Sequence, residues 1–162
     1  SLRDIVLRLE SGSTASEHGR RYIMDYGGHV ALLGALRSPV HSNNPEVLAS
    51  CAKALGVLAI DSGSDADAAR DELLSQSAPR VIIDTMVMPQ FRKDVRIQYS
   101  CMEALRHFAG SDEASNSATS LMRREIIGKG GDKAICAGMK NNILDISIQR
   151  MGCCALRKLS YG

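Results

Sequence analysis

The sequence contains no tryptophan, and aromatic residues make up only 4% of its 162 positions. A hydrophobic core must therefore be assembled from leucine, isoleucine, valine, methionine and alanine. These side chains suit helices packed closely side by side. No run of about 18 apolar residues is present, so we expect no membrane-spanning segment. Arg3 and Asp4 interrupt the early apolar stretch, which argues against a signal peptide at this start.

The sequence also carries no large excess of positive or negative charge. The formal net charge is +2, too small to indicate a nucleic-acid partner from bulk electrostatics. The five cysteines are an odd number, and the adjacent Cys153 and Cys154 form a poor intramolecular pair. No pair of Cys-x-x-Cys units is present, so the sequence lacks the ligand spacing typical of a structural zinc site. We therefore expect reduced core thiols and a cytoplasmic location (nuclear or cytoskeleton-associated being the alternatives), with neither a metal nor a cofactor.

What the sequence does contain is one pattern in three copies. Ile23–Gly28 is followed about 50 residues later by Leu73–Ala78, and about 50 residues after that by Ile126–Gly131. Each copy precedes an apolar helical stretch and then a longer helix that carries one apolar stripe of helical period. The stripes are Val47, Cys51, Leu55 and Leu58; Ile97, Cys101, Leu105 and Phe108; and Ile148, Gly152, Leu156 and Leu159. A helical pattern repeated at this spacing predicts a stacked α-solenoid.

Each copy is expected to form a short helix, a tight turn, a middle helix, a loop and a long helix. The expected first helices span 14–25, 67–76 and 119–127, and the middle helices span 30–37, 80–87 and 132–140. Asn44, Asp94 and Asp145 are placed to cap the three long helices. The glycine pairs at 27–28 and 130–131 supply the positive φ that a sharp corner needs.

These segments resemble the armadillo-repeat family, whose units have a short first helix, an Ile-Val-x-x-Gly-Gly-like corner, a leucine-rich second helix and a third helix ending in Ala-Leu-x-x-Leu-Ala. The matching segments are Ile23–Gly28, Ala31–Leu36 and Ala54–Ala59. Ser77-Ala78 departs from the corner motif, and the units exceed the usual length. The resemblance implies an all-α, right-handed α-α superhelix of three armadillo-like repeats. The expected repeats are 11–60, 61–110 and 111–162 within one domain, 1–162, with 1–10 as the remnant of a preceding helix.

The first residues align with the end of a later long helix, because Ser1–Val6 matches Ala104–Ala109. From this alignment we hypothesise that the chain is a segment of a longer array. The terminal repeats of a solenoid normally carry a polar outer face, and no such cap is visible here. Self-association through uncapped solenoid ends is therefore a further expectation.

The resemblance also implies a function. In armadillo arrays the third helices line a concave groove, so we expect a non-catalytic scaffold that binds a partner helix or an extended peptide of another protein. The expected contact residues are Lys53, Val57, Arg96, Ser100, Glu103, His107, Met151, Cys154 and Lys158. Importin-α-like members hold basic peptides with Trp and Asn at two of these positions. Neither residue type stands there in this sequence, so an import receptor is not favoured.

Binding of RNA is the alternative from another class. The loop Gly128–Gly131 resembles the backbone-clamping loop of a KH domain, although such a domain needs strands around that loop. The other basis is a basic ridge formed by Arg20, Arg21, Arg123 and Arg124 on equivalent first helices. An enzyme is not expected, because no cysteine or serine stands beside an oriented base and no Gly-Lys-Ser/Thr ending forms a phosphate loop.

Overall fold

The structure is a computed structural model that describes residues 14–60, 64–111 and 117–161. Within these ranges every regular element is a helix and no strand is present, as the sequence predicted for its fold class. In chain order the helices are α2 (Thr14–Asp25), α3 (Gly28–Arg37), α4 (Pro45–Leu58), α5 (Ser64–Ser75), α6 (Ala78–Val87), the 3-10 helix η1 (Pro89–Phe91), α7 (Val95–Phe108), α8 (Ser117–Gly128), α9 (Gly131–Asn141) and α10 (Ile146–Leu159). The expected remnant helix at 1–10 lies outside the described residues.

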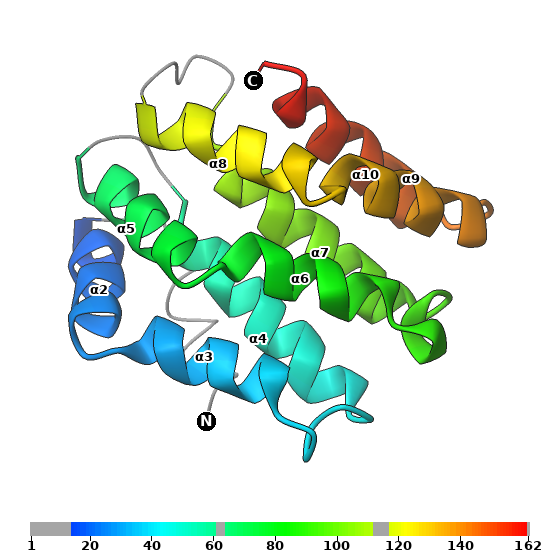
Figure 1. Ribbon diagram of the computed structural model, residues 1–162, viewed down its shortest axis with the longest axis horizontal. Coiled ribbons are helices and arrows are strands. Elements are labelled where there is room, and N and C mark those ends of the chain that lie inside the picture. The colour runs from blue at the N-terminus through cyan, green and yellow to red at the C-terminus, as the bar shows by residue number, and fades with distance from the viewer. Residues whose placement is uncertain (1–13, 61–63, 112–116, 162) are drawn as a thin grey trace.

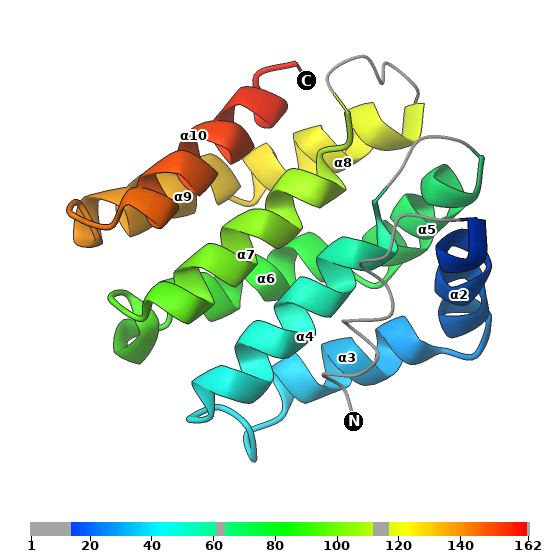
Figure 2. The same cartoon turned by 180° about the vertical axis from the view of Figure 1, so that it is seen from behind.

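The helices form three successive units, each made of a first, a second and a third helix. The third helices α4, α7 and α10 lie side by side in chain order (Figure 2), and the second helices α3, α6 and α9 form a parallel row behind them (Figure 1). The first helices α2, α5 and α8 pack in the same order at one end of the stack. Each unit therefore contacts its neighbours in the chain, and α7 lies between α4 and α10.

The caps of the three third helices lie where the sequence placed them. Asn44 Oδ1 accepts a hydrogen bond from the Val47 N–H at 3.2 Å, and Asp145 Oδ1 accepts one from the Ile148 N–H at 2.9 Å. Asp94 Oδ1 accepts from two backbone N–H groups, at 3.0 and 3.1 Å. These bonds satisfy N–H groups that have no partner within their own helix, and they define where each third helix begins.

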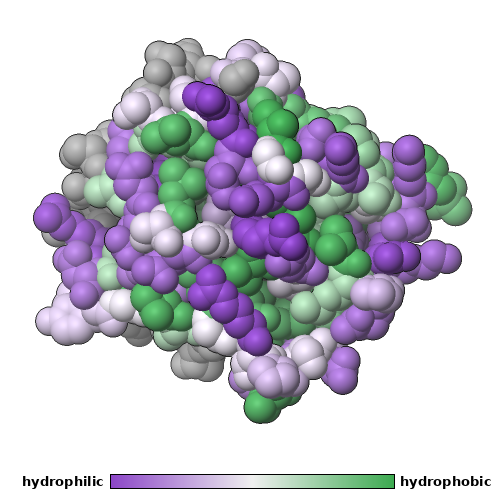
Figure 3. Space-filling view, viewed as in Figure 1, coloured by the Kyte–Doolittle hydropathy of each residue, from purple (hydrophilic) through white to green (hydrophobic). Residues whose placement is uncertain are grey.

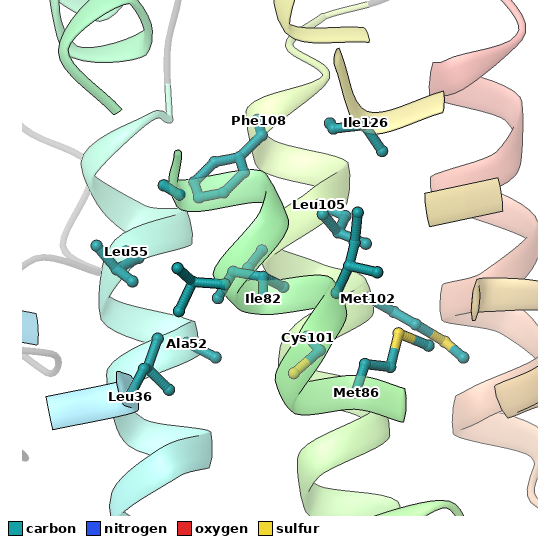
Figure 4. Packing of buried hydrophobic residues seen from close by; sticks show 14 of the residues in the cluster. Leu36, Ala52, Leu55, Ile82, Met86, Cys101, Met102, Leu105, Phe108 and Ile126 are labelled. Atoms are coloured by element: carbon teal, nitrogen blue, oxygen red, sulfur yellow. The ribbon is translucent and has the colours of Figure 1, made fainter. Parts of the chain in front are cut away.

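The core lies between the rows of second and third helices. Leu55 and Leu105 have no exposed surface, and Ile82 and Met86 from the second-helix row point toward α7 (Figure 4). Leu156, the equivalent residue of the last unit, is only partly buried, because no described helix packs against the outer side of α10. The repeated leucine therefore occupies the same position in each unit, but its burial depends on a following unit.

The corner between first and second helices is built in two ways. Gly27, Ser77 and Gly130 each adopt a left-handed backbone conformation, with φ of 73°, 55° and 79°. In the first and last units the residue after this left-handed position is glycine, and an isoleucine lies five residues before that glycine. In the last unit a Cβ at Gly131 would lie 2.5 Å from the Ile126 Cγ2 methyl, which explains the glycine. The middle unit has Leu73 and Ala78 at these two positions. Since leucine has no γ2 methyl, the alanine Cβ of that corner has room.

This pairing predicts a coupled effect on stability. Gly131→Ala in the native background should lower the free energy of unfolding by about 1–3 kcal/mol, the usual cost of overpacking a filled site. The same change made together with Ile126→Leu should cost less, because the closest clash is then absent and the 2.9 Å approach to the backbone oxygen of residue 126 remains. Urea unfolding of the two single variants and the double variant measures the coupling. Strictly additive costs would contradict the explanation.

Candidate functional site: the face of the third helices

The predicted contact residues lie on the row of third helices, but they are not equally accessible. Arg96 and Cys154 are exposed, and Lys53 and Glu103 are partly buried at equivalent positions of α4 and α7. The three remaining partly buried residues are His107, Met151 and Lys158. Lys53, Glu103 and Cys154 occupy equivalent positions of α4, α7 and α10, so a ligand that crosses this side of the helices would pass one of them on each.

Two of the predicted contact residues are buried and do not line a surface. Val57 retains 3% of its exposed area and Ser100 retains 8%. The cause is the close crossing of α4 and α7: a Cβ at Gly56 would lie 2.8 Å from the Ala104 Cα. Val57 follows Gly56 directly, and Ser100 lies one turn before Ala104 on the same side of α7. The expectation that these two residues face a partner is therefore wrong.

One half-buried aromatic residue on this face was missed by sequence reasoning. Tyr99 lies on α7 between Arg96 and Glu103, three residues from one and four from the other, and it packs against the edge of the core. Residues at these spacings share one side of a helix. The signal was present in the sequence, because Tyr99 is one of only four tyrosines.

The electrostatics of the face centre on His107, which carries no charge at neutral pH. Burial, together with the neighbouring cations Arg106, Lys158 and Arg70, lowers its pKa to about 3. The Arg106 Nη2 group lies 2.8 Å from His107 Nε2, so the guanidinium donates and the imidazole accepts. His107 can therefore offer a partner no positive charge.

The depressed pKa of His107 predicts a pH dependence of stability. Between the unfolded value near 6.5 and the folded value of about 3, the unfolded chain binds a proton that the folded chain does not. The free energy of unfolding should therefore fall as the pH falls through this window. His107→Gln keeps an acceptor and removes the titration, so its unfolding free energy should fall less between pH 7 and moderately acidic pH. Equal losses in urea titrations of the two proteins would contradict the assignment.

The predicted basic ridge of the first helices is not a surface feature. Arg20 and Arg123 retain 8% and 1% of their exposed area, whereas Arg21 and Arg124 are exposed. Arg123 donates from Nε to the Ala109 carbonyl at 2.8 Å. The same side chain donates to two further carbonyls, those of Ser111 at 2.6 Å and Tyr161 at 3.2 Å. The expected four-arginine ridge is therefore wrong, because half of it is internal.

The middle unit shows that these buried arginines have a structural task. Arg70, the equivalent of Arg123, donates to the Ala59 carbonyl at 2.8 Å and to Asp67 Oδ1 at 3.2 Å. Ala59 and Ala109 are the C-cap residues that directly follow α4 and α7. A cation bonded to the carbonyls at a helix C-terminus satisfies groups without helical partners and favours the helix dipole. Each of these arginines thus ties a first helix to the third helix of the preceding unit.

Neighbouring Arg123 and Arg124 allow a matched test of this task. Arg123→Met should lower the free energy of unfolding by about 2–4 kcal/mol, because three backbone carbonyls lose a charged donor. Arg124→Met changes the adjacent, exposed position and should cost within about 0.5 kcal/mol. Urea denaturation followed by circular dichroism measures both. Similar costs for the two variants would contradict a structural role specific to Arg123.

The glycine-rich loop after α8 is a corner between two helices. Gly128 ends α8 and Gly131 begins α9, and Lys129 Nζ lies 3.6 Å from Glu125 Oε1 one turn back. The described ranges on both sides of this loop contain no strand. The KH-like interpretation required strands there, so this part of the RNA-binding alternative loses its structural basis.

A cavity of about 500 Å³ lies between the first two units, lined by residues of α2, α3, α4 and α5. His29 is 5% exposed at its wall, with Nε2 3.3 Å from Glu72 Oε1, and its Nδ1 has no hydrogen-bond partner among the described residues. The charged residues around it have both signs, which selects no single class of ligand.

The cysteines divide into two groups. Cys51 and Cys101 are buried, and burial raises the pKa of the Cys101 thiol to about 12. Cys136, Cys153 and Cys154 are exposed, so the expectation of core thiols is wrong for Cys136 and Cys153, whereas Cys154 was expected on the contact face. No described cysteine forms a disulfide. Among the described residues no group of three or more His, Cys, Asp or Glu side chains is arranged to hold a metal ion.

None of the helices in the described ranges combines the length and the apolar character needed to cross a membrane. Comparison of the chain with protein-family models, with curated proteins and with solved structures found no match.

Proposed function

We propose that the chain is an armadillo-like solenoid that acts as a non-catalytic protein-interaction scaffold. A partner helix or extended segment binds across α4, α7 and α10. The observation that supports this proposal is the side-by-side packing of these three helices, on which Lys53, Glu103 and Cys154 occupy equivalent sequence positions about 50 residues apart.

The spacing of the helices suits a ligand that runs across them. Packed helices lie about 8–10 Å apart, and an extended chain advances about 3.3 Å per residue. A bound segment therefore places about every third residue over a new helix. Equivalent positions recur along this direction, so each unit supplies one contact of the same geometry.

The chemistry of the face favours a segment with charges of both signs and one large apolar side chain. Lys53 and Glu103 carry opposite charges at equivalent positions of α4 and α7, and Arg96 is exposed beside an Asp94 carboxylate 3.5 Å away. Tyr99 lies between these charged positions on the central helix. Half-buried aromatic residues near the centre of an interface contribute most of the binding free energy in many complexes, and we assign this anchor role to Tyr99.

The test exchanges charges without changing the net charge. Peptides selected from a random library against the native chain should bind Lys53→Glu/Glu103→Lys at least about tenfold more weakly, because each partner charge then meets one of its own sign. The matched control is Arg80→Asp/Asp84→Arg, which exchanges an exposed ion pair of 2.8 Å on α6, in the opposite row. It should bind the peptides as the native chain does.

Fluorescence anisotropy measures these affinities, and circular dichroism confirms that both exchanged variants remain helical. Peptides that bind all three proteins equally, or that lose affinity only for the α6 variant, would contradict the proposed face. A failure to select any peptide would count against the scaffold role itself.

A further inference from the structure

The loops between second and third helices lie along one edge of the stack, at the end opposite the first helices (Figures 1 and 2). Side chains bond each loop to the next. Gln90 Nε2 donates to the Ser42 carbonyl at 3.4 Å, and Asn142 Nδ2 donates to the Arg92 carbonyl at 3.1 Å. Residues 38–46, 88–96 and 140–150 therefore form one continuous surface, here named the loop edge.

Each of the last two loops is also held by a glutamine of the helix that follows it. Gln98 Nε2 donates to the carbonyls of Met86 at 2.8 Å and Phe91 at 3.0 Å. Gln149 Nε2 donates to the carbonyls of Met139 at 2.9 Å and Asn142 at 3.2 Å. The backbone of the loop edge is thus fixed before any ligand arrives, which lowers the entropy that binding must remove.

The last loop presents three aliphatic side chains to solvent. Ile143 is 66% exposed, Leu144 is 93% exposed and Ile146 is 75% exposed. The corresponding loop of the middle unit has the charged pair Arg92-Lys93 where this loop has Ile143-Leu144. Figure 3 shows hydrophobic atoms at this end of the molecule, where α9 meets α10. Scattered apolar residues on a surface are ordinary, but a contiguous group on a rigid loop marks an interaction site. These three residues are named the aliphatic tip.

Positive charge surrounds the aliphatic tip. Arg92, Lys93, Lys140 and Arg150 are all exposed on the loop edge. The carboxylates of the loop edge are those of Asp94 and Asp145, which cap α7 and α10, and that of Glu46 in the first turn of α4. The unit that carries the tip is itself basic, because residues 117–161 contain eight Lys and Arg against three Asp and Glu, although the whole chain has a net charge of only +2. The occupant of this surface must therefore carry negative charge.

We propose that the loop edge docks the chain on an anionic lipid surface. The aliphatic tip enters the boundary between headgroups and acyl chains, and the four exposed cations meet the lipid phosphates and carboxylates. The shape of the site favours lipid over an acidic protein segment. The tip protrudes and would need a complementary pocket in a protein, whereas a bilayer admits it without one. The edge is also roughly straight over three loops, which suits a planar surface (Figure 2). This surface adjoins the face of the third helices and overlaps it only at the start of α7, where Arg96 lies.

The experiment uses the absence of tryptophan from the chain, so that one introduced tryptophan is the only such fluorophore. In L144W the emission should shift to the blue with vesicles of phosphatidylcholine and phosphatidylserine, because the indole leaves water. High salt should diminish the shift, and pure phosphatidylcholine should give none. The matched control is L121W, which reports from a leucine of α8 that is 51% exposed and away from the loop edge. Its emission should not change.

The second measurement is vesicle sedimentation, made with proteins that carry no introduced tryptophan. I143S/L144S should bind vesicles containing phosphatidylserine about tenfold more weakly than the native sequence, since aliphatic groups that insert are replaced by polar ones. Both serines replace exposed residues, so the fold is retained, as circular dichroism can verify. The proposal is overturned by a native chain that fails to sediment with these vesicles, by equal shifts of L144W and L121W, or by unchanged binding of I143S/L144S. Failure of the native chain to sediment would leave an acidic protein segment as the occupant.

Discussion

The stack depends on bonds between buried arginines and the carbonyl ends of helices. Arg70 joins the first helix of the middle unit to the end of α4, and Arg123 joins the first helix of the last unit to the end of α7. A long helix leaves its last carbonyls without partners, and their burial without a donor costs free energy. The guanidinium supplies several donors in one plane, so a single side chain satisfies the helix end and ties two units together.

The opposite ends of the third helices are fixed by different groups. Asp94 and Asp145 cap their first turns, and Gln98 and Gln149 hold the loops that lead into them. With both ends fixed, α7 cannot slide against its neighbours, and side chains about 50 residues apart keep a constant register. The two proposed surfaces follow from this arrangement. The third-helix face presents rows of equivalent residues, and the loop edge presents residues that differ between units.

Much of this architecture could be predicted from local patterns. The caps at Asn44, Asp94 and Asp145 and the all-helical fold rest on residues close together in sequence, whose effect is decided within one or two turns. Predictions that required knowledge of neighbours were less reliable. Val57 was expected on a surface because helical periodicity gives only the direction of a side chain. It is buried because Gly56 permits α7 to approach closely.

The sequence by itself determined where the third helices begin, which apolar stripe of each faces inward, and that equivalent positions recur about every 50 residues. Only the tertiary structure decided which charges are internal. Arg123 and Arg124 are adjacent and identical in type, yet one bonds three carbonyls in the interior while the other is exposed. The physical reason is that a side chain is buried only when a second surface packs against it. Local sequence patterns place an arginine on a helix. The helix end whose carbonyl accepts its hydrogen bond comes beside it only when the units stack.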